Sequence, residues 1–174
     1  MTTDGDRLAA LRREFDESFA RAAAAAAGDS ERLVAVRLGG DRFALRVAEI
    51  ASVHPITAIT RLPGAPRGQL GIVNVRGQLA AVYDAATLLG YTSAGEPHRW
   101  CALCAEDRGM GLAIGAVEGY LRVERASLRA IAAEDETNRL LTHAFEHEGR
   151  VYRVLDVSAF RAAVAELVGA RGPR

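Results

Sequence analysis

The chain has 174 residues, which is enough for one domain that buries a core without disulfides or metals. Its 22 basic residues, all arginine, balance 22 acidic residues, and this zero net charge argues against general nucleic-acid binding. Two cysteines cannot build a disulfide framework, and no apolar run approaches the roughly 18 residues of a membrane span.

Residues 1–30 are expected to form an N-terminal helical extension that ends near Gly28. Apolar side chains recur there every three or four residues and make one narrow stripe, formed by Leu8, Leu11, Phe15 and Phe19. The stripe fits packing on the same chain or in a groove of another protein, and both remain open. Acidic residues precede the alanine run at 22–27, whereas a secretory signal begins with a basic region, so we expect a cytoplasmic protein.

After Glu31 the pattern changes to short strands separated by turns. Strands are expected at 33–38, 43–47, 70–75, 79–83, 100–105, 110–114, 120–123, 140–146 and 151–157. One helical turn is expected at 85–89, and a closing helix at 159–168. Strands this short and frequent favour an all-β barrel or sandwich, and no alternating strand–helix–strand pattern points to a Rossmann-like fold.

Residues 71–84 form the most informative segment, which is expected to be a hairpin. Its predicted two-residue connection is Gly77-Gln78, where Gly77 supplies the positive φ that a tight turn needs. Asn74 is expected to bond the local backbone and hold the turn. Arg76 can then present its rigid donor fork to a carboxylate.

The same segment resembles the signature hairpin of the CheW-like family, the coupling proteins of bacterial chemosensory arrays. The family pattern begins with a glycine, two aliphatic residues, Asn, an aliphatic residue, Arg and Gly. An apolar strand that ends in Asp follows. Further similarity lies, in the family's order, at 43–50, 60–66, 111–119 and 154–157, so the resemblance covers about residues 31–168. The chain departs from the family pattern at Ser52, Ala81, Ala85 and Gly115.

The resemblance implies that residues 31–168 fold as two packed, SH3-like, five-stranded β-barrel subdomains, followed by a tail at 169–174. It implies a non-enzymatic adaptor of a two-component system, with no catalytic residue, metal or cofactor. The implied partners are the regulatory domain of a CheA-type histidine kinase and the cytoplasmic tip of methyl-accepting chemoreceptors. No nucleic-acid partner is expected. The protein would reach a membrane only indirectly, through recruitment to receptor arrays.

The resemblance also assigns partner contacts residue by residue. Ile50 and Gly71 match positions on the kinase side, and Arg76 matches a position on the receptor side. Three neighbours of Arg76 complete the expected partner-binding set, and these are Asn74, Val75 and Gly77.

Two alternatives remain in view. His98, Cys101 and Cys104 have a spacing that suggests a small zinc-binding or thiol-redox site, to which two later histidines could add ligands. However, residues three apart on a strand face opposite sides, so both thiolates would not reach one ion. A ligand- or oligonucleotide-binding β-barrel is the other alternative, although aromatic residues make up only 6% of the chain and are scattered.

Overall fold

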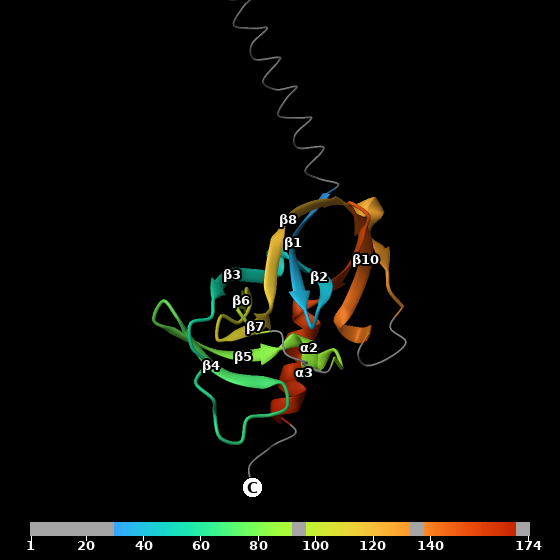
Figure 1. The fold of residues 1–174 in the computed structure, drawn as a ribbon. Helices are drawn as coiled ribbons and strands as arrows, with labels where there is room; N and C mark the ends of the chain where they lie inside the picture. Colours follow the sequence, from blue (N-terminus) through green and yellow to red (C-terminus); the bar gives the residue numbers. More distant parts are fainter. Residues whose placement is uncertain (1–29, 92–96, 133–137, 170–174) are drawn as a thin grey trace, which may run out of the picture.

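The computed structural model describes residues 30–91, 97–132 and 138–169, which form two β-sheets and a few short helices (Figure 1). The predicted helical extension before Ser30 lies outside the described residues. The strands are β1 (Ser30–Leu38), β2 (Asp41–Arg46), β3 (Ile50–Pro55), β4 (Gln69–Val75), β5 (Gln78–Asp84), β6 (Trp100–Cys104), β7 (Met110–Ile114), β8 (Ala116–Glu124), β9 (Arg129–Ala130), β10 (Leu141–His147) and β11 (Arg150–Leu155). The helices are α2 (Ala85–Leu88), α3 (Val157–Gly169) and the 3-10 turns η1 (Val47–Glu49), η2 (Arg125–Ser127) and η3 (Asn138–Leu140).

The chain enters one sheet, builds the other, and then returns to complete the first. The strand order is β8-β1-β2-β11-β10-β9 in the six-stranded sheet and β3-β6-β7-β5-β4 in the five-stranded sheet. Two parallel pairings, β11 with β2 and β5 with β7, join strands that are distant in sequence. The mainly β prediction is therefore confirmed. The expectation of five strands in each unit is wrong for the first sheet, where the short β9 adds a sixth strand beside β10.

Apolar residues lie on both faces of the central strands because each sheet packs on two sides. In β6, Cys101 and Leu103 join a cluster inside the five-stranded sheet, whereas Ala102 and Cys104 join a central cluster. The central cluster also takes side chains from the six-stranded sheet and from α3, including Phe160. A third cluster lies inside the six-stranded sheet. The alternation of side chains along a strand explains how nearly continuous apolar segments fill two clusters at once.

Helix α3 begins two residues before the predicted start because its first turn is capped from two directions. Asp156 Oδ1 accepts from Ala159 N at 2.8 Å, and Glu49 Oε2 accepts from Val157 N at 3.0 Å. These carboxylates satisfy amide groups that the first helical turn leaves without partners. Within the described part of the chain, no helix has both the length and the apolar character needed to cross a bilayer.

Candidate functional site

The hairpin of β4 and β5 turns one residue earlier than the sequence suggested. Val75 pairs with Gln78, so the two-residue connection is Arg76-Gly77 and the predicted Gly77-Gln78 connection is wrong. Both turn residues have positive φ, 51° for Arg76 and 88° for Gly77, which is the pattern of a primed hairpin turn. Arg76 itself adopts the left-handed conformation that the sequence analysis gave to Gly77 alone. Its exposed side chain consequently sits in the turn.

The turn is held by the side chain that the sequence singled out. Asn74 Oδ1 accepts a hydrogen bond from Gly77 N at 2.8 Å, which confirms the expected local bond. Side chains alternate along β4, so Val73 and Val75 point into the cluster of the five-stranded sheet while Asn74 is exposed. Val75 therefore supports the hairpin from inside, and the polar groups of Asn74 and Arg76 face the solvent.

Gly71, at the other end of β4, is buried and has a structural requirement of its own. A Cβ atom placed there would lie 2.2 Å from the Thr60 carbonyl oxygen and 2.8 Å from Ile59 Cγ2. The backbone approaches this closely because Thr60 pairs with Ile72 through two hydrogen bonds, Thr60 N to Ile72 O at 2.9 Å and Ile72 N to Thr60 O at 2.8 Å. Glycine at 71 thus lets the preceding loop lie against β4.

Ile50 lies apart from the hairpin, on β3, at the opposite end of the strand order of the same sheet. Its half-buried side chain packs against the central cluster. The preceding residue, Glu49, binds Arg46 Nη1 at 3.3 Å and the backbone of Val157 at 3.0 Å, while its carbonyl accepts from Ala105 N at 2.9 Å. Ile50 therefore follows a residue that is fixed to both sheets and to α3.

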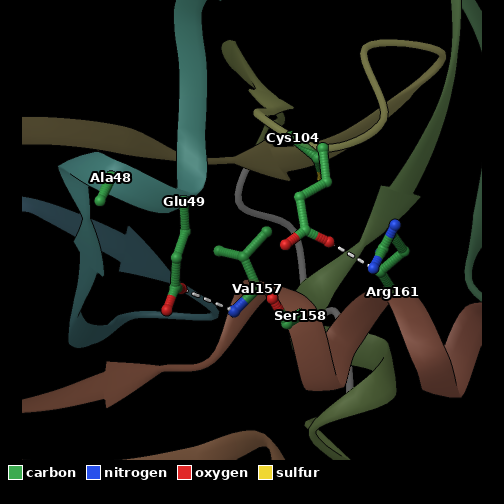
Figure 2. A pocket seen from close by; sticks show the side chains of 7 residues that line it. Ala48, Glu49, Cys104, Val157, Ser158 and Arg161 are labelled. Atoms are coloured by element: carbon green, nitrogen blue, oxygen red, sulfur yellow. Dashed lines mark hydrogen bonds and ion pairs between the residues drawn. The ribbon is translucent and has the colours of Figure 1, made fainter.

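The junction at Glu49 is completed by Arg46, which the sequence analysis missed. Arg46 Nε donates to Glu31 Oε1 at 2.7 Å, and Nη2 contacts Thr142 Oγ1 at 3.0 Å and His143 Nδ1 at 3.2 Å. In Figure 2 the Glu49 side chain reaches down to the start of α3. The small hollow beside it is lined by Ala48, Glu49, Cys104, Glu106, Val157, Ser158 and Arg161. An Arg three residues before a Glu is the only sequence signal for this contact, and it is too common to be informative.

Asp84, which ends the hairpin, is a buried capping residue. Its Oδ1 accepts from Ala86 N at 3.0 Å and its Oδ2 from Thr87 Oγ1 at 2.6 Å, while His98 Nε2 lies 3.4 Å from Oδ1. Burial acts to raise the pKa of Asp84, but the hydrogen bonds from His98 and Thr87 outweigh it and leave the pKa below its ordinary value. The Asp84 carboxylate therefore caps the first turn of α2, and it is buried inside the domain.

The cysteine alternative gains no support from the geometry. Cys101 and Cys104 are buried in different clusters, as expected for residues three apart on a strand. Burial raises the pKa of the two thiols to about 11 and about 12, so both are protonated at neutral pH. Among the residues that the structure describes, no three His, Cys, Asp or Glu side chains gather as a metal site. His98 is instead engaged with Asp84.

Comparison with known proteins places most of the chain in one family. The model of the CheW-like domain matches residues 32–164. A probable chemotaxis protein CheW of Rhizobium etli is 32% identical over 98 residues, covering 55% of this chain and 63% of that protein. The chemotaxis protein CheW of Rhizobium meliloti is 30% identical over 93 residues, covering 52% of this chain and 60% of that protein. The matched segment therefore spans less than two thirds of either relative.

The fold comparison agrees with the family match. The crystal structure of the scaffolding protein TtCheW from Thermoanaerobacter tengcongensis superposes with a TM-score of 0.64 at 17% identity, covering 73% of this chain and 84% of that chain. At 17% identity the superposition shows that the two chains share a fold, and no more than that. Together with the family match over residues 32–164, it leads to one conclusion: the chain belongs to the CheW-like domain family.

Proposed function

We propose that this protein is a non-enzymatic adaptor that couples chemoreceptors to a CheA-type histidine kinase in a chemosensory two-component pathway. The family match supports the proposal, as do the names of the two rhizobial relatives and of the scaffolding protein with the same fold. The protein acts in the cytoplasm and reaches the membrane through receptor arrays. It binds both partners at once, and multivalency within an array strengthens contacts that are modest one by one.

The domain division proposed for this role assigns residues 1–30 to a helical extension, 31–168 to the CheW-like domain and 169–174 to a tail. Within the domain we propose two SH3-like barrels. Each sheet has an interior cluster of its own, and both share the central cluster, as expected for two curled sheets packed side by side. The shared cluster gives a mechanical link through which a contact on one barrel can influence the other.

The observation that carries the functional proposal is the position of Arg76 in the turn of a braced hairpin. The cytoplasmic tip of a chemoreceptor is its proposed partner. The side chain is exposed, its backbone is fixed with φ at 51°, and Asn74 closes the turn. A guanidinium held this way can bind a carboxylate with little loss of conformational freedom. Gly77 completes the turn, and Val75 anchors it in the core.

The proposed kinase contact lies on the same sheet, away from the hairpin tip. Ile50 takes part through its half-buried side chain on an outer strand. Gly71 takes part through the backbone of β4. Because Gly71 has no side chain, this backbone lies close to the preceding loop. The regulatory domain of the kinase is the proposed partner. The separation of these residues from Arg76 would let kinase and receptor bind together.

A charge reversal at the hairpin tip tests the proposal. The variant Arg76→Glu should lose most receptor recruitment in a pull-down, while it keeps its thermal stability and its binding of the kinase regulatory domain. The β10–β11 hairpin offers a matched control, because its turn residue Glu148 also has φ at 51° and is followed by Gly149. Glu148→Arg should recruit the receptor normally. Unchanged recruitment by Arg76→Glu would remove the hairpin from the proposed mechanism.

A further inference from the structure

A groove of about 720 Å³ lies between α3 and the end of α2, two elements that are neighbours in Figure 1. The turn η3 closes it on a third side. Three leucines and three alanines make up its apolar lining, and these are Leu88, Leu140, Ala159, Ala162, Ala163 and Leu167. All three alanines lie on α3, and such short side chains let a second helix approach this face closely.

The dimensions and charges of the groove suit a short amphipathic helix. Its lining extends along α3 from Ala159 to Leu167, about 12 Å at the rise of an α-helix. That is a little over two turns, the length over which a docked helix contacts a groove through residues spaced three or four apart. The charged residues of the lining, Arg67, Arg139 and Glu166, are exposed and carry both signs. The groove therefore fits a helix with one apolar face and mixed charges.

One stretch of this chain has the sequence of such a helix. Outside the described residues, the stretches 92–96, 133–137 and 170–174 contain no apolar side chain larger than alanine or proline. Residues 1–29 carry charges of both signs and the apolar stripe of the expected helical extension. The stripe is formed by Leu8, Leu11, Phe15 and Phe19. It spans about 17 Å as a helix, which is enough to cover the groove.

The N-terminal segment is also long enough to bring the stripe to the groove. Strand β1 runs for nine residues from Ser30, about 27 Å, and a Cβ atom on the next residue, Gly39, would lie 3.5 Å from Ala86 Cβ. Ala86 precedes Thr87, which lines the groove, so Ser30 lies within about 40 Å of it. A helix over residues 5–28 is about 36 Å long, and the two residues that link it to Ser30 add about 7 Å.

We infer that the N-terminal stripe docks as an amphipathic helix into the groove between α2 and α3 of the same molecule. The chain turns back at Gly28, where the sequence ends the helix. Phe15 and Phe19 supply most of the apolar area that the groove covers. Attachment to the same chain gives the segment an effective concentration of the order of millimolar, so it excludes a free helix of similar chemistry. The groove includes none of the proposed partner-binding residues, and the inference does not depend on the proposed function.

A labelled peptide with the sequence of residues 5–21 tests this inference on the full chain. The double variant Phe15→Asp/Phe19→Asp should leave the groove open, whereas the wild type keeps it filled. Fluorescence anisotropy should therefore show peptide binding to the double variant at least about tenfold tighter than to the wild type. Ala162→Arg, added to the double variant, should weaken this binding about tenfold, because the exposed Ala162 lines the groove. Ala165→Arg is the matched control and should leave binding intact, because Ala165 is exposed on the same helix outside the groove.

Four results of this experiment would each overturn the inference. They are equal binding to the wild type and the double variant, no binding to the double variant at millimolar concentration, an unaffected Ala162→Arg form, and an equal loss in the Ala165→Arg control. A wild-type dimer in sedimentation that dissociates in the double variant would assign the groove to the segment of a second copy and overturn it too. Arg76→Glu, added to the double variant, should leave peptide binding intact, so failure here is separable from failure of the proposed function.

Discussion

Replacing Gly71 with alanine should destabilise the domain strongly, although it adds a single methyl group. The new Cβ would lie 2.2 Å from the Thr60 carbonyl oxygen, so the loop has to move off β4 and give up two backbone hydrogen bonds with Ile72. Each such bond contributes about 1 kcal/mol. The φ of 146° adds about 1–3 kcal/mol of backbone strain for a residue with a side chain. The expected loss in the free energy of unfolding is therefore about 3–5 kcal/mol.

Urea unfolding followed by the fluorescence of Trp100, the single tryptophan, measures this loss. Gly77→Ala is the matched control, because that residue also has positive φ, at 88°, but no atom lies within 4 Å of the added Cβ. The control should lose only about 1–2 kcal/mol, the cost of the left-handed conformation. If the two variants unfold at similar urea concentrations, the argument from the Thr60 contact is wrong. A kinase-binding defect in Gly71→Ala should accordingly be corrected for the unfolded fraction.

Two further predictions concern ionisable groups. Asp84→Asn should cost about 1–2 kcal/mol near pH 7, because the Asp84 carboxylate caps α2 through Ala86 N and Thr87 Oγ1. Since the folded pKa of Asp84 is lowered, its stabilisation is complete above the unfolded pKa of about 3.9 and disappears as the pH falls through the folded pKa. The stability gap between wild type and variant should therefore close in acid, and a gap that widens would contradict this. Cys101 and Cys104, with pKa values of about 11 and about 12, should resist a thiol reagent at pH 8 until urea unfolds the chain, and rapid labelling of the native protein would refute their burial.

Local patterns in the sequence were enough to predict nine of the eleven strands that the structure describes, and the nature of the β4–β5 hairpin, but they missed β3 and the short β9. The position of its turn was predicted wrongly, because the expected turn has Gly77 as the first of its two residues and Gln78 as the second. A primed two-residue turn needs positive φ at both central residues. Arg76 accepts that conformation with Asn74 bound to the following amide. A non-glycine residue in this conformation is uncommon, so the sequence pattern favoured the wrong register.

Other features that sequence patterns did not predict depend on contacts between distant residues. The parallel pairing of β11 with β2 joins the two ends of the domain, and no local signal specifies it. Glu49 caps a helix that begins at Val157, 108 residues later. The opposition of Arg32 and Arg122 likewise follows from strand register, which the spacing of residues along one strand leaves undefined.

The most direct test of the adaptor proposal is whether the chain bridges two partners at once. The measurement is the amount of kinase regulatory domain that sediments with vesicles carrying a chemoreceptor, with and without this protein. The account predicts that the kinase domain sediments only when the wild-type chain is present, and that Arg76→Glu abolishes most of this effect while Glu148→Arg preserves it. Kinase domain that stays in the supernatant at every concentration of the wild-type chain would contradict the account.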